Sequence, residues 1–202
     1  MQKIALLALI GLAGSASAAV WSGTGFVIPD ASTAGISSVI AVSGDAPSIG
    51  GVEVTLFDLR HTWVGDLVAT LTSPSGTEFT LFARVGAAVP GAGDSSNLGG
   101  NYIFSDSAAG DFWAEAAAGT SSYVMASGAY RTTAALSASP TDMNAAFAGQ
   151  DSTGNWTLKI SDNAGADLGS LGSWELNIVV PTPGSLAVLG FAGIVAGRRR
   201  RN

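Results

Sequence analysis

The sequence contains no cysteine and only one histidine, His61. The absence of cysteine excludes disulfide bonds, a thiol nucleophile and a thiolate metal site. A single imidazole also cannot build a metal site from several histidines. Any catalytic role for histidine must therefore centre on His61.

Basic residues are scarce between the two ends of the chain. Lys3 and Arg198–Arg201 lie near the termini, so four basic residues face all 15 acidic ones in the central part, a net charge of −11. Nucleic-acid binding is disfavoured, because phosphate neutralisation needs clustered Lys or Arg. A surplus of carboxylates suits Ca²⁺ binding or solubility outside the cell.

Apolar runs occur at both ends, but each is too short to cross a bilayer as a helix. Residues 1–18 combine Lys3, an apolar run over 4–13 and an Ala16-Ser17-Ala18 site, which predicts a signal peptide cleaved after Ala18. At the other end, 184–197 would give a helix of about 21 Å, short of the hydrocarbon thickness of roughly 30 Å. Both ends predict export, and the arginines that close the chain would stay on the cytoplasmic side: Arg198, Arg199, Arg200 and Arg201.

Alternation of apolar and polar residues recurs between the ends, whereas helical periodicity does not. Trp156, Leu158 and Ile160 share one face of a predicted strand, and Trp174, Leu176 and Ile178 share a face of another. Similar runs begin near residues 36, 52, 67 and 79, with Gly-rich turn signals between them. This pattern predicts an all-β sandwich or barrel of seven to nine strands. Residues 86–150, rich in Gly, Ala and Ser, are expected to form a long ordered excursion over the sandwich.

The stretch around His61 raises the question of catalysis. Asp58, Asp66 and Ser73 lie near it in sequence, as a Ser-His-Asp triad would need after folding. The run Gly93-Asp94-Ser95 is similar to the start of some esterases, but those carry their histidine near the C-terminus, and no Gly-x-Ser-x-Gly elbow occurs. A lone histidine is most often a packed, hydrogen-bonded residue, so the sequence favours a structural role.

Two further sets of residues are candidates for ligand binding. Four aspartates are either Ca²⁺ ligands or groups that cap loops: Asp58, Asp66, Asp162 and Asp167. Trp63 and Trp113, in loop-like context, could stack on a sugar. Trp156 and Trp174 are in register with core positions of their strands and are predicted to be buried.

The motifs of the central part resemble the P domain (P/Homo B domain) of kexin- and furin-like proprotein convertases and of many secreted bacterial proteases. The resemblance rests on "HTWVGDL" at 61–67, "SPSGT" at 73–77, "GNWTL" at 154–158, "DNA" at 162–164 and "GSLGSWEL" at 169–176. It implies a jelly-roll-like β-sandwich of about eight strands. The implied structural residues are His61, Trp63, Gly65, Asp66, Trp156 and Trp174.

In that family the module lies beside a subtilisin-like catalytic domain, stabilises it and influences its calcium and pH dependence. The remainder of this sequence is too short for such a domain, so the resemblance implies the scaffold without proteolysis. The tail resembles a PEP-CTERM sorting signal read by an exosortase-like enzyme, with Thr182 where the usual motif has Glu. Its motif residues are Pro181, Thr182, Pro183 and Gly184, followed by the apolar helix and the four arginines.

The sequence thus predicts three parts: a signal peptide over 1–18, a β-sandwich over 19–180 and a sorting tail over 181–202. The expected protein is a non-enzymatic bacterial module, exported to the cell envelope and anchored in the membrane through its tail or released after processing. Its partner would be an extracellular protein or polysaccharide. Two alternatives stay open: a module that docks on a separately encoded subtilisin-like protease, and a carbohydrate-binding jelly roll.

Overall fold

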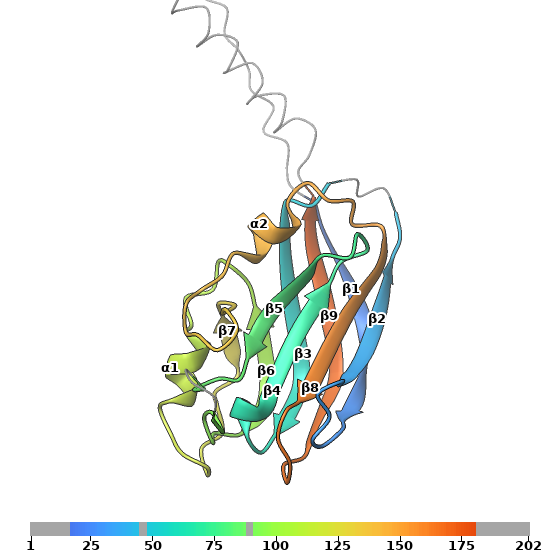
Figure 1. Ribbon diagram of the computed structural model, residues 1–202. Helices are drawn as coiled ribbons and strands as arrows, with labels where there is room; N and C mark the ends of the chain where they lie inside the picture. Colours follow the sequence, from blue (N-terminus) through green and yellow to red (C-terminus); the bar gives the residue numbers. More distant parts are fainter. Residues whose placement is uncertain (1–16, 45–47, 88–90, 181–202) are drawn as a thin grey trace, which may run out of the picture.

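The computed structural model describes residues 17–44, 48–87 and 91–180 (Figure 1). Within these ranges the chain forms nine strands in two sheets, so the predicted all-β sandwich is confirmed. The predicted sorting tail, with its expected apolar helix, and most of the predicted signal peptide lie outside the described residues. In the part that is described, no helix is long and apolar enough to cross a membrane.

One sheet has five strands in the order β1-β9-β3-β6-β7. Its neighbours pair antiparallel, except for β6 and β7, which run parallel. The strand bounds are β1 Ser17–Ile28, β3 Gly51–His61, β6 Leu98–Phe104, β7 Gly128–Tyr130 and β9 Gly169–Val180.

The second sheet has four antiparallel strands in the order β2-β8-β4-β5. A single turn of 3₁₀ helix, η1, leads from β3 of the first sheet into β4 of the second. Two short α-helices lie beside the strands, each begun by an aspartate whose side chain accepts backbone N–H groups of the first turn. The bounds are β2 Ile36–Val42, η1 Val64–Asp66, β4 Leu67–Thr72, β5 Glu78–Ala83, α1 Phe112–Ala116, α2 Met143–Phe147 and β8 Gly154–Asp162.

The core lies between the two sheets and follows the predicted alternation. Trp156, Leu158 and Ile160 of β8 are all fully buried, as are Trp174 and Leu176 of β9. Their polar neighbours along each strand point outward, because successive side chains of a strand alternate between its faces. The prediction that both tryptophans belong to the core is therefore confirmed.

Trp174 also connects the two sheets through its polar edge. Its Nε1 donates a hydrogen bond to Ser38 Oγ on β2 at 3.0 Å. Gly23 of β1 lies against the indole ring, and a Cβ at that position would overlap with it. A glycine is needed there because the ring occupies the space of a side chain.

The sequence predicts residues 86–150 as a long excursion over the sandwich, but in the structure this region also contributes two strands to the five-stranded sheet. It supplies β6, which pairs with β3, and β7, which pairs with β6. Phe104 of β6 and Phe112 of α1 are fully buried, with ring centroids 5.2 Å apart. These aromatic rings extend the main core, so the region belongs to the same domain.

Trp156→Ala should lower the free energy of unfolding by about 3–5 kcal/mol, the usual loss when a buried aromatic side chain is truncated. The indole packs edge-on against Phe147 at 5.1 Å, and its Nε1 donates to the Ser152 carbonyl oxygen at 2.9 Å. Val39→Ala, on the exposed face of β2, is the control and should change stability by less than about 0.5 kcal/mol. Urea unfolding measures both variants. A loss below about 1 kcal/mol for Trp156→Ala would contradict its place in the core.

Candidate functional site around His61

His61 is the last residue of β3, and its side chain is fully buried. Its Nε2 lies 3.2 Å from Oδ2 of Asp162, the last residue of β8, whose side chain is also fully buried. Its Nδ1 lies 2.9 Å from the carbonyl oxygen and 3.1 Å from the backbone nitrogen of Trp63. Both ring nitrogens are therefore held by the protein, and neither faces solvent.

The contact between His61 and Asp162 joins the two sheets at one end of the sandwich. His61 lies in the five-stranded sheet, where it pairs with Leu98 of β6 and Gly169 of β9. Asp162 lies in the four-stranded sheet, where it pairs with Leu67 of β4. Gly169 leaves room for the imidazole, because a Cβ at that position would overlap with His61 Cδ2. The histidine thus occupies space that a side chain on β9 would need.

The residues that follow His61 hold the loop at 91–96. Trp63 Nε1 donates to the Ala92 carbonyl oxygen at 2.8 Å, and the Gly65 backbone N–H donates to the Asp94 carbonyl oxygen at 3.0 Å. A Cβ on Gly65 would lie 2.5 Å from the Asp94 nitrogen, which is closer than real Cβ contacts come. A glycine is needed at this position because the two backbones approach so closely.

Asp66 connects η1 to the residue that follows β5 and to the turn between β8 and β9. Its Oδ1 accepts a hydrogen bond from Arg84 Nη1 at 3.3 Å, and its backbone carbonyl accepts the Asn163 backbone N–H at 2.9 Å. Burial raises the pKa of the Asp66 carboxyl, while the Arg84 guanidinium acts in the opposite direction. Arg84 also donates to the Gly91 carbonyl oxygen at 2.6 Å and so helps to fix the same loop.

Ser73 does not meet His61. It follows β4 at the far end of the sandwich, beyond the six residues of that strand, which span about 20 Å. Its Oγ lies 2.9 Å from Ser75 Oγ in the turn between β4 and β5, and 2.9 Å from Oε1 of Gln150, which lies between α2 and β8. The run Gly93-Asp94-Ser95 lies in the loop at 91–96, where Asp94 Oδ1 accepts the Ser96 N–H at 2.8 Å. The two serine candidates are thus placed in a turn and in a loop.

The four predicted calcium ligands do not all come together. Asp58 pairs with Arg60 at 2.8 Å on the exposed surface. Asp162 and Asp167 both act to raise the pKa of Asp66, so these three carboxylates face one region. Asp162 is bound to His61, however, and Asp167 accepts the Thr62 hydroxyl at 2.7 Å. Among the described residues no group of three or more His, Cys, Asp or Glu side chains is arranged to hold a metal ion. Each of these carboxylates already has a partner within the protein, whereas Ca²⁺ takes six to eight oxygen ligands, and the melting experiment described below tests calcium binding in solution.

The two tryptophans considered for sugar stacking lie in different surroundings. Trp63 is partly buried and bound through Nε1 to the loop at 92, as described above. Trp113 packs against the main core from α1. Both tryptophans are only partly exposed.

Arg84 has no clear signal in the sequence, and Asn163 and Gly169 occur within motifs of the family resemblance that do not indicate their contacts. The three residues come from separate segments, and only the fold brings them to the region of His61 and Asp66. The spacing of Asp162-Asn163-Ala164 does not show that Asp162 meets His61. Asp66, which lies near His61 in sequence, instead binds Arg84.

The fold and the site together define a β-sandwich module in which the one histidine connects the two sheets. The sequence model of the proprotein convertase P-domain matches residues 49–123 and 115–178. The chain belongs to this family.

Similarity to individual proteins is lower. The chain is 26% identical over 152 residues to leupeptin-inactivating enzyme 1 of Streptomyces exfoliatus, which covers 74% of this chain and 23% of the relative. A crystal structure of the Aeromonas sobria serine protease with the chaperone ORF2 matches with a TM-score of 0.43 and 15% identity, and covers 81% of this chain and 27% of that one. The protease alone matches with a TM-score of 0.42, 14% identity and 82% and 27% coverage. The chain thus spans 23% to 27% of the length of these relatives.

His61→Ala should lower the free energy of unfolding by about 1–3 kcal/mol, because it leaves the buried Asp162 carboxylate without the imidazole. The melting temperature should fall by several degrees. Arg60→Ala is the control, since its ion pair with Asp58 is exposed and contributes little. An unchanged melting temperature for His61→Ala would contradict the structural role.

Addition of Ca²⁺ to an EDTA-treated sample should leave the melting temperature unchanged. The buried carboxylates already have protein partners, so the ion would have to displace Arg84 and His61. A melting temperature that rises with Ca²⁺ concentration would be the linkage expected of a bound ion and would restore the metal interpretation. Mg²⁺ at the same concentration controls for ionic strength.

Proposed function

We propose that this chain is an exported, non-catalytic P-domain module that has a binding or structural role at a bacterial cell envelope or in the extracellular matrix. The observation that carries the proposal is the burial of His61, with both ring nitrogens engaged by Asp162 and Trp63. A general base must be able to reach a substrate or a nucleophile through hydrogen bonds. The imidazole of His61 reaches neither a substrate nor a nucleophile, because both of its nitrogens are engaged within the protein.

The remaining polar groups of the site support the same conclusion. Asp66, Asn163 and Arg84 hold backbone segments together through hydrogen bonds and an ion pair, as expected of residues that join loops. The serines considered as nucleophiles, Ser73 and Ser95, lie in a turn and in a loop. Membership of the family supports the β-sandwich fold. The enzymatic activity of the longer relatives is not assigned to this chain.

Export and sorting are proposed from the two ends of the sequence. Cleavage after Ala18 would remove Ser17 and Ala18 from β1, together with their pairing to Val180 and Val179. The pairs from Ala19 onward would remain, so the proposed cleavage is compatible with a folded sandwich. The tail would then be recognised by an exosortase-like enzyme after membrane insertion.

A second candidate function is docking on a separately encoded subtilisin-like protease. Two of the most exposed large apolar side chains, Val27 (73%) and Leu168 (72%), belong to the same end of the β1–β9 pair, where Val27 pairs with Ser170. Exposed apolar groups at one end of a module suit contact with another protein. The family to which the chain belongs is named after proprotein convertases, and this supplies the class of partner for the alternative.

Mass spectrometry of the chain recovered from its native host tests the proposal. We expect the extracellular or envelope fraction to contain a chain that begins at Ala19 and lacks Arg198–Arg201. Ala18→Arg should block cleavage, whereas Ala19→Ser should not. A chain recovered only from the cytoplasm with Met1 or its neighbours intact would contradict export.

The purified chain should show no turnover of peptide, ester or glycoside substrates. A hydrolase activity that disappears in His61→Ala while the melting temperature stays unchanged would contradict the non-catalytic assignment. Co-purification of a subtilisin-like protease with the native chain, lost in a Val27→Ser and Leu168→Ser variant, would favour the docking alternative.

A further inference from the structure

Each sheet of the sandwich ends in two edge strands, β1 and β7 in the five-stranded sheet and β2 and β5 in the four-stranded sheet. An edge strand carries backbone N–H and C=O groups that have no partner in its own sheet and can pair with a strand of another chain. Proteins usually protect such edges with charged residues, proline, a short strand or a covering segment. The four edges of this sandwich differ in that protection.

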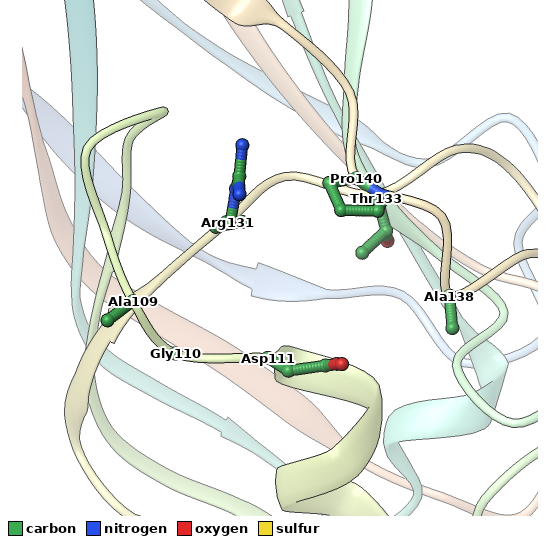
Figure 2. A pocket seen from close by; sticks show the side chains of 7 residues that line it. All are labelled: Ala109, Gly110, Asp111, Arg131, Thr133, Ala138 and Pro140. Atoms are coloured by element: carbon green, nitrogen blue, oxygen red, sulfur yellow. The ribbon is translucent and has the colours of Figure 1, made fainter.

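The edges at β5 and β7 are protected. The Leu81 carbonyl oxygen of β5 accepts the Thr133 N–H at 3.1 Å, so another segment of the chain covers this edge. Figure 2 shows Thr133 and Pro140, which form a bridge within that segment. β7 has only three residues, and Tyr130 at its end forms a further bridge with Gly110 on the side away from β6. Neither strand presents a long row of open backbone groups.

The edges at β1 and β2 lie together along one side of the sandwich and lack such protection (Figure 1). Thr24 Oγ1 of β1 lies 3.4 Å from Ser38 Oγ of β2, so the two edges adjoin. β1 has 12 residues and β2 has seven, and neither strand contains a charged residue or a proline. Among the described strands, β1 pairs with β9 alone and β2 with β8 alone.

This side of the sandwich also differs from the rest of the domain in charge. Asp30 is the only charged residue in the sequence from Ser17 to Gly44, although the central part of the chain carries a net charge of −11. Three exposed valines lie on the two strands: Val20 (57%), Val27 (73%) and Val39 (52%). Two copies of so acidic a domain repel each other. They can approach most closely where charge is absent and apolar side chains are exposed.

We propose that two copies of this chain associate through this side, with β1 of one copy antiparallel to β1 of the other. A two-fold axis perpendicular to the five-stranded sheet produces this arrangement, because the same edge then meets itself with its direction reversed. The two five-stranded sheets become one continuous sheet of ten strands, held by main-chain hydrogen bonds. The β2 strands of both copies then lie on the same side of that sheet, which explains why β2 also lacks charge.

The size of this side suits a dimer. At about 3.4 Å per residue, β1 is about 40 Å long, and the two layers with their side chains are roughly 15–20 Å thick. Each copy would therefore bury about 600–800 Å², close to the roughly 800 Å² per partner of a standard interface. The inference goes beyond the proposed function and depends on neither export nor the absence of catalysis.

Sedimentation velocity of the purified full chain tests the association. We expect a monomer–dimer equilibrium with a dissociation constant on the order of micromolar. Val20→Glu should weaken the association by about tenfold or more, because it places a negative charge on the edge of both copies. Val124→Glu is the matched control, since it adds the same charge at a similarly exposed valine (52%) beside the start of β6 and should leave the association unchanged.

Hydrogen exchange of the backbone amides identifies the strand that forms the contact. Every second N–H of an antiparallel edge strand points away from its own sheet. Over Ala18–Thr24 we expect these amides to be protected in the dimer and to exchange rapidly after dilution and in Val20→Glu. The amides of the central strand β3 should stay protected in every sample, which shows that the fold is retained.

Three results would overturn the proposal. A chain that stays monomeric at every concentration would leave this edge to a different protein, such as the protease of the docking alternative. A dimer that Val20→Glu does not weaken would show that the copies meet elsewhere. Protection over Ala18–Thr24 that persists in the monomer would show that a segment of the same chain covers the edge. Export and hydrolase activity are measured separately, so the outcomes remain distinguishable.

Discussion

The hydrogen bond between His61 and Asp162 connects the last residues of two central strands that belong to different sheets. Apolar packing holds the faces of a sandwich together along its length but does not fix how the ends of its strands meet. A buried pair of polar side chains does so. Each side chain loses its hydrogen bonds to water and can replace them only when its partner lies at one particular position. The 3₁₀ turn that leads from one sheet to the other begins three residues after this histidine.

The surrounding contacts depend on this geometry. Gly169 and Gly65 allow other backbones to come close to the junction, and Trp63, Asp66 and Arg84 hold the loop around residues 91–96. That loop leads directly into β6, so the junction also determines where the region 98–130 joins the five-stranded sheet. A stretch of sequence that looks like catalytic machinery thus works as a structural junction.

The strands could be predicted where the signal is local. Alternation around Trp156 and Trp174 fixes both the strand and its buried face, because the side-chain period of two is a property of the strand itself. β6 and β7 were not predicted as strands, since "LGGNYIF" and "GAY" contain glycines and little alternation. β6 pairs with β3, and β7 pairs with β6, so both strands depend on partners that are distant in sequence. The His61 site was only partly predictable for the same reason: its burial and structural role could be expected, but the choice of Asp162 among 15 acidic residues could not.

The central claim is that His61 and Asp162 stabilise the protein as a pair that joins the two sheets. A double-mutant cycle measures this directly, through the unfolding free energies of the native chain, His61→Ala, Asp162→Ala and the double variant at neutral pH. The account predicts a coupling energy of about 1–3 kcal/mol, because each residue's contribution requires the other. Additive effects, with a coupling energy below about 0.5 kcal/mol, would show that the two side chains act independently and would contradict the account.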